Sequence, residues 1–142
     1  MAHPKAKEIL GQFGFLADYG RQMEVPEGFA VIRDGDAAGS MFFILDGLVE
    51  VTKDERLLAV LEPGEVFGEM SLVDGRPRSA NVAALQATQL IRIDRDEFEQ
   101  AGSQNLELLR FMMEVMANRI RNTNALAAAF APARQTEVAE AL

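Results

Sequence analysis

The feature that most constrains the fold is a series of short apolar runs between residues 22 and 94, most of them separated by Gly, Asp or Pro. The runs cover residues 29–32, 41–45, 48–51, 57–61, 81–85 and 88–93. Short strands bounded by turn residues are typical of an antiparallel sandwich or barrel. Within this series, the Asp46-Gly47 pair separates two β-rich runs and predicts a β-hairpin. A Pro63-Gly64 pair predicts a further turn.

Helical patterns lie on both sides of this β-rich region. Residues 5–19 carry apolar positions at helical spacing, but several glycines predict a short or broken helix. Asp94 followed by Glu97 predicts a capping box that opens a C-terminal helix. A longer helix is expected from about residue 104 to 130, where Pro132 ends it.

Two apolar stripes run along the predicted long helix. The first alternates spacings of three and four, as a heptad seam does, through Leu106, Leu109, Met113, Met116, Ile120, Thr123, Ala127 and Phe130. The second stripe holds Leu108, Met112 and Val115. One stripe can cover the β-domain while the other meets a partner helix, or both can be core. The fold class expected is α+β, mainly β: one domain over 1–130, with the β-roll at 22–94, helices at 94–130 and a flexible tail at 131–142.

Composition excludes several function classes. The chain has 142 residues, a formal net charge of −8, no cysteine and one histidine. Disulfides and thiolate chemistry are therefore absent, and a zinc or non-haem iron site lacks ligands. The chain has no basic run of the kind that favours direct binding to nucleic acid. No apolar run approaches the roughly 20 residues that span a membrane. We expect a cytoplasmic protein without a metal or cofactor, in which His3 is a disordered surface residue.

The stretch from Phe67 to Val82 carries the most chemistry. Gly68 allows a close approach of backbone to a ligand, and residues 69–72 can form a helical turn whose free N–H groups suit an anion. Arg78 offers a planar guanidinium that grips phosphate oxygens in a bidentate way. Glu69 would repel a phosphate unless it faces another part of the ligand, and a ribose 2′-hydroxyl would satisfy it.

This stretch resembles the phosphate-binding cassette of the cyclic nucleotide-binding domain family, whose pattern is F-G-E-x-[AS]-L, a gap, then P-R-x-A-x-V. The matching residues are Gly68, Glu69, Ser71, Leu72, Pro77, Arg78, Ala80 and Val82. The resemblance implies a jelly-roll β-roll, an Arg78 contact with the cyclic phosphate and a Glu69 contact with the ribose 2′-hydroxyl. It also implies a backbone cradle and an apolar base pocket. The cradle comprises Gly68, Met70, Ser71, Ser79 and Ala80, and the base pocket comprises Val51, Leu58, Leu61, Phe67 and Val82.

Three positions bear on which nucleotide binds. The long helix resembles the dimer helix of catabolite activator-type proteins, which places Thr123 where a polar residue reads adenine, although it can instead only set helix register. Ser79 can favour guanine, but some cyclic AMP binders also carry serine there. Asn81 departs from the family's usual Thr or Ser. We expect cyclic AMP to be preferred over cyclic GMP, and Arg119 to be solvated rather than to cap the pocket.

The predicted function is a non-catalytic, stand-alone receptor that signals through movement of its C-terminal helix. Its predicted partners are the cyclic nucleotide, a second copy paired through that helix, and an effector protein that the sequence does not identify. The alternative is the sensor half of a catabolite activator-type transcription regulator, for which too little chain remains after residue 130 to hold the DNA-binding domain. An enzyme of the cupin type and a haem or iron–sulfur sensor both lack their metal ligands here.

Overall fold

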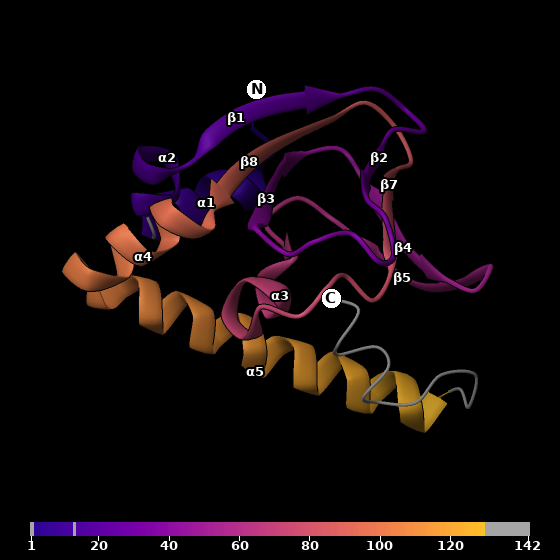
Figure 1. Ribbon diagram of the computed structural model, residues 1–142. Helices are drawn as coiled ribbons and strands as arrows, with labels where there is room; N and C mark the ends of the chain where they lie inside the picture. Colours follow the sequence, from indigo (N-terminus) through magenta and orange to yellow (C-terminus); the bar gives the residue numbers. More distant parts are fainter. Residues whose placement is uncertain (1, 13, 130–142) are drawn as a thin grey trace.

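The chain folds into a β-roll with helices packed against one side (Figure 1). The computed structural model describes residues 2–12 and 14–129, with side chains for 2–12, 14 and 16–121. The strands are β1 (Arg21–Val25), β2 (Ala30–Ile32), β3 (Ser40–Asp46), β4 (Val49–Lys53), β5 (Arg56–Leu61), β6 (Val66–Phe67), β7 (Asn81–Ala84) and β8 (Thr88–Asp94). They form two 4-stranded antiparallel sheets, ordered β1-β8-β3-β6 and β2-β7-β4-β5. The predicted mainly β, antiparallel roll is confirmed.

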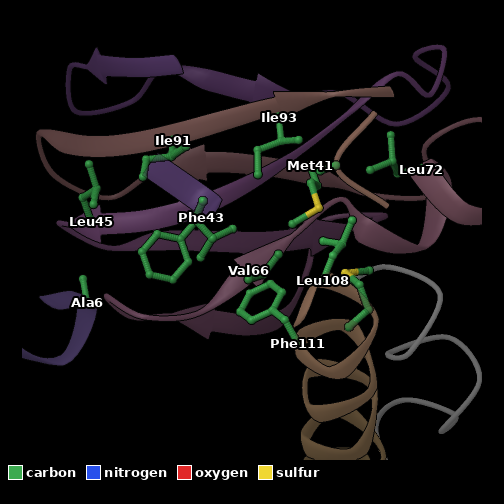
Figure 2. Close-up of a cluster of buried hydrophobic side chains, with 13 residues drawn as sticks. Ala6, Met41, Phe43, Leu45, Val66, Leu72, Ile91, Ile93, Leu108 and Phe111 are labelled. Atoms are coloured by element: carbon green, nitrogen blue, oxygen red, sulfur yellow. The ribbon is translucent and has the colours of Figure 1, made fainter. Parts of the chain in front are cut away.

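Strand β3 explains why the run from 41 to 45 is continuously apolar. Its alternate side chains enter two different cores, because successive residues of a strand point to opposite faces. Met41, Phe43 and Leu45 join the cluster that lies against the helices, as Figure 2 shows. Phe42 and Ile44 point the other way, into the interior of the roll. The strand is therefore buried on both faces.

The hairpin predicted at Asp46-Gly47 is wrong. β3 and β4 flank this pair but belong to different sheets, so the chain crosses between sheets at Gly47, which has φ of 102°. A Cβ at Gly47 would clash with Thr88 Oγ1, so close packing as well as φ requires glycine. The hairpin instead joins β4 to β5 through Asp54 and Glu55, both at positive φ. Two consecutive residues at positive φ are typical of the type I′ turn, which suits a two-residue hairpin. This turn usually contains glycine, but here it contains none.

The helices begin and end close to where the sequence predicts. They are α1 (Pro4–Gln12), α2 (Phe15–Tyr19), α3 (Glu69–Asp74), α4 (Arg95–Gln104) and α5 (Leu106–Ala129). The N-terminal helix is broken as expected, and the capping box of Asp94 and Glu97 is present. No helix among residues 2–12 and 14–129 is long and apolar enough to cross a membrane. The predicted tail, 131–142, lies outside the described residues.

His3 is not the disordered residue that the sequence suggested. Its backbone N–H donates to the carbonyl of Leu45 at 2.8 Å, and its Nδ1 accepts from the backbone N–H of Lys5 at 3.1 Å. The side chain thereby caps the first turn of α1, where backbone N–H groups otherwise lack partners. Position near a terminus alone therefore gave a wrong prediction for this residue.

The two stripes of α5 have different environments. Leu108 and Met112 are buried with the helix-side core, and Val115 packs against it. On the first stripe, Leu109 and Ile120 are 60% and 59% exposed. The second stripe thus covers the β-roll, and the described part of the heptad seam faces outward except at Met116, which packs against the same core.

Candidate functional site

The predicted cassette is built around the turn that joins β6 to α3. Gly68 stands before α3 in a left-handed conformation with φ of 84°. A Cβ there would lie 2.9 Å from Arg78 Nη1 and 3.0 Å from the carbonyl oxygen of Ser40. Glycine is thus needed both for the conformation and for the close approach of Arg78.

Arg78 lies beside this turn and is held by acceptors from two other segments. Its Nη1 donates to the Gly68 carbonyl at 3.0 Å, and its Nη2 donates to the Ser40 carbonyl at 2.6 Å. The residue is only 7% exposed. Burial lowers the pKa of Arg78, while the negative charges of Asp36 and Glu69 raise it. The result is a fixed, buried cation, which is what binding of an anion requires.

Glu69 is the first residue of α3 and is completely buried. Its Oε1 accepts from Nε of Arg119 at 3.1 Å, so the cassette is joined to α5 by a buried ion pair. Burial raises the pKa of Glu69, and the charge of Arg119 opposes that rise. Glu69 and Arg78 thus face different partners instead of pairing with each other at the surface.

The buried ion pair is not fully satisfied. Within the described part of the chain, Glu69 Oε2 and Arg119 Nη2 are both buried without a hydrogen-bond partner. Such orphaned polar atoms cost free energy in a protein interior, so those that persist often mark functional positions. One is an acceptor and the other a donor, a combination that a single hydroxyl group satisfies.

Arg119 is the residue that sequence reasoning placed wrongly. It was expected to be solvated, but it is 7% exposed. The available signal was helical spacing, because Arg119 follows Leu108, Met112 and Val115 on the stripe that covers the roll. A charged residue on an inward stripe needs a buried partner, and Glu69 is that partner.

The remaining predicted residues fall into two groups. Met70, Ser71 and Ser79 line a small pocket of ≈ 50 Å³ beside α3. The interior of the roll holds the other set, namely Val51, Leu58, Leu61, Phe67, Ala80 and Val82, all of them buried in one cluster. Thr123 lies on α5, but its side chain is outside the described part. The structure therefore brings the cassette residues together, and the roles of the apolar residues and of Thr123 stay predictions.

Comparison with known proteins decides the family. The model of the cyclic nucleotide-binding domain matches residues 22–105, which include β1 except its first residue, β2 to β8 and the whole cassette. The chain belongs to this family. It is a cyclic nucleotide-binding module, in agreement with the resemblance of the cassette.

Individual relatives share part of their length with this chain. A Pycsar effector protein of Xanthomonas perforans is 34% identical over 115 residues, which cover 80% of this chain and 38% of that protein. A CRP-like cAMP-activated global transcriptional regulator of Mycobacterium tuberculosis is 26% identical, covering 72% of this chain and 48% of the regulator. The chain thus spans less than half the length of these relatives.

Solved structures give the same fold. The catabolite activator protein of Thermus thermophilus matches with a TM-score of 0.72 and 26% identity, covering 84% of this chain and 58% of that one. A structure from work on a cyclic-GMP-dependent pathway in bacterial phytopathogenesis has a TM-score of 0.69 and 28% identity, covering 79% and 93% of the two chains. The overall fold is therefore shared with both.

Proposed function

We propose that this chain is a non-catalytic, cytoplasmic receptor that binds cyclic AMP in preference to cyclic GMP and signals through α5. The observation that carries the proposal is the buried pair of Glu69 and Arg119 with one unpartnered atom on each residue. A ribose 2′-hydroxyl donates to Glu69 Oε2 and accepts from Arg119 Nη2, and so satisfies both atoms at once. Ribose binding then acts directly on the contact between cassette and helix.

Arg78 is the proposed phosphate ligand. Its guanidinium is fixed by the carbonyls of Gly68 and Ser40, so little rotamer freedom is lost when a phosphate binds. The pocket beside Met70, Ser71 and Ser79 supports an anion site that continues from α3. These groups form the proposed cradle.

The preference for cyclic AMP is supported by the names of two relatives. The mycobacterial regulator is described as cAMP-activated, and a Thermus thermophilus relative is named a cyclic AMP receptor protein, 36% identical over 78 residues. Thr123 is the proposed reader of the base, and the buried apolar residues of the roll form the proposed base pocket.

Signalling requires that the nucleotide bind two arrangements of α5 with different affinity, because a ligand shifts an equilibrium only by that difference. Arg119 supplies the link, since it belongs to α5 and contacts the proposed ribose ligand Glu69. The altered helix then acts on an effector protein or on a second copy of the chain. The exposed seam of Leu109, Met113 and Ile120 supports pairing of two copies through α5.

The second candidate is the sensor half of a catabolite activator-type transcription regulator. It is favoured by the 48% coverage of the mycobacterial regulator and the 58% coverage of the Thermus structure. The two candidates share the ligand site and differ in output. Sequencing the gene beyond the codon for Leu142 decides between them, since the second requires a helix-turn-helix in the same reading frame.

The experiment that tests the ribose assignment is calorimetric titration with cyclic AMP and its 2′-deoxy analogue. Wild type should favour the ribose form by about 10-fold or more, since a hydrogen bond to a charged group contributes ~1.5–3 kcal/mol. Glu69→Gln should reduce this ratio, whereas the control Glu24→Gln, on the exposed part of β1, should keep it. Equal affinity of wild type for the two ligands would remove Glu69 from the site.

A further inference from the structure

An apolar groove lies on the side of the molecule where α3, α4 and α5 meet. It encloses ≈ 810 Å³ and is lined by Val73 of α3, by residues of α4, and by Met113 and Ile120 of α5. The side chains of Val73, Met113 and Ile120 are 60%, 64% and 59% exposed. Exposed apolar side chains gathered in one groove are typical of an interaction site.

The charges in the groove point to its occupant. The chain carries a net charge of −8, so two copies repel each other over most of their surfaces. Among the residues that line the groove, the charged ones are Arg95 and Glu99, which have opposite signs and are one turn apart on α4. In an interface with twofold symmetry, the same patch of each copy faces the other copy, so Arg95 of one copy can face Glu99 of the other, and the reverse. A patch with one cation and one anion is therefore complementary to a second copy of itself.

We propose that a second copy of this chain covers the groove, with Arg95 of each copy facing Glu99 of the other. The proposal rests on the proposed pairing through α5 and extends it, because the contact then includes α3 and α4 and not only the heptad seam. Met113 and Met116 suit such a contact, since methionine side chains adapt to the surface that they meet.

The inclusion of α3 gives the interface a regulatory meaning. Glu69 opens α3 and Val73 lies near its end, so one short helix contacts both the proposed nucleotide and the proposed partner. Arg95 also reaches α3, with Nη2 3.5 Å from the carbonyl oxygen of Ser71. Nucleotide affinity and dimer affinity are then linked, and each must change the other by the same factor.

The test is the dimer dissociation constant, measured by analytical ultracentrifugation with and without cyclic AMP. Val73→Asp should weaken the dimer at least about 10-fold, because a carboxylate would be buried in an apolar contact. Arg95→Glu and Glu99→Arg should each weaken it by a similar factor, since like charges then face each other. The double variant Arg95→Glu/Glu99→Arg should return to within about 3-fold of wild type, although it still lacks the arginine beside Ser71.

Two controls make the result specific. Val60→Asp alters an exposed valine of β5, outside the groove, and should leave the dissociation constant unchanged. Thermal melts of each variant separate loss of pairing from loss of folding. If Ile120→Glu gives monomers but Val73→Asp and the charge exchange change nothing, the contact is confined to α5 and the groove proposal is wrong. If wild type is monomeric at every concentration, pairing through α5 fails as well.

Discussion

Replacing Arg119 with methionine removes the positive partner of a carboxylate that is completely buried. The two side chains are 9% and 0% exposed and their charged atoms are 3.1 Å apart, so the pair is poorly screened by solvent. Removing one partner of a buried pair typically costs about 3–5 kcal/mol, because the other charge is left uncompensated. That is a large share of the ~5–15 kcal/mol by which domains are usually stable.

The stability lost in Arg119→Met should depend on pH, because Glu69 can take up a proton instead of remaining charged. Burial raises the pKa of Glu69 in the folded chain above its ordinary value. The folded state therefore binds more protons than the unfolded state between the two pKa values, and stability falls as the pH rises through that window. Without Arg119 the pKa rises further, so the window extends to higher pH.

Urea unfolding followed by circular dichroism between pH 5 and pH 8 measures this effect. Arg110→Met is the matched control, since Arg110 is on the same helix but its side chain is 69% exposed, in a surface pair with Glu114. The control substitution should lower the free energy of unfolding by no more than about 0.5 kcal/mol. Two results would contradict this prediction: a loss of unfolding free energy in Arg119→Met no larger than that in Arg110→Met, or a loss in Arg119→Met that does not shrink toward acid pH.

Three further outcomes follow from the site. Arg78→Lys should weaken cyclic AMP binding at least ~30-fold in calorimetry, because loss of a desolvated charged contact costs ~2–5 kcal/mol, and a change below threefold would exclude Arg78 from the site. Gly68→Ala should lower both affinity and melting temperature, since its φ is +84° and a Cβ would meet Arg78 Nη1, whereas Gly39→Ala has nothing within 4 Å and should be neutral. Ile120→Glu should give monomers by light scattering that still bind nucleotide, and loss of both properties would mean that α5 had lost its fold.

Much of the β-roll could be predicted because most of its strands are visible in the sequence as short apolar runs. Turn residues follow most of the apolar runs, and the run from 41 to 45 is apolar throughout because β3 is buried on both faces. Which strands pair is a different matter, since the Asp46-Gly47 signal is the same whether the chain reverses in one sheet or crosses to the other. The hairpin turn at Asp54 and Glu55 contains no glycine, so no residue type indicated a hairpin there.

The cassette could be predicted for a related reason. Gly68, Glu69 and Arg78 lie within one stretch of sequence, so their spacing is visible without the fold. The partner of Glu69 is 50 positions away and on another element. Its position could have been inferred only by combining the inward stripe of α5 with the requirement that a buried arginine have an acidic partner.

The most direct test of the receptor is calorimetric titration of the wild-type chain with cyclic AMP, cyclic GMP and linear 5′-AMP under identical conditions. The proposed site predicts saturable binding of the two cyclic nucleotides, with cyclic AMP the tighter, and much weaker binding of 5′-AMP, whose doubly charged terminal phosphate does not match the single cyclic phosphate proposed for Arg78. Absence of saturable binding by both cyclic nucleotides, or affinity for 5′-AMP equal to that for cyclic AMP, would contradict it.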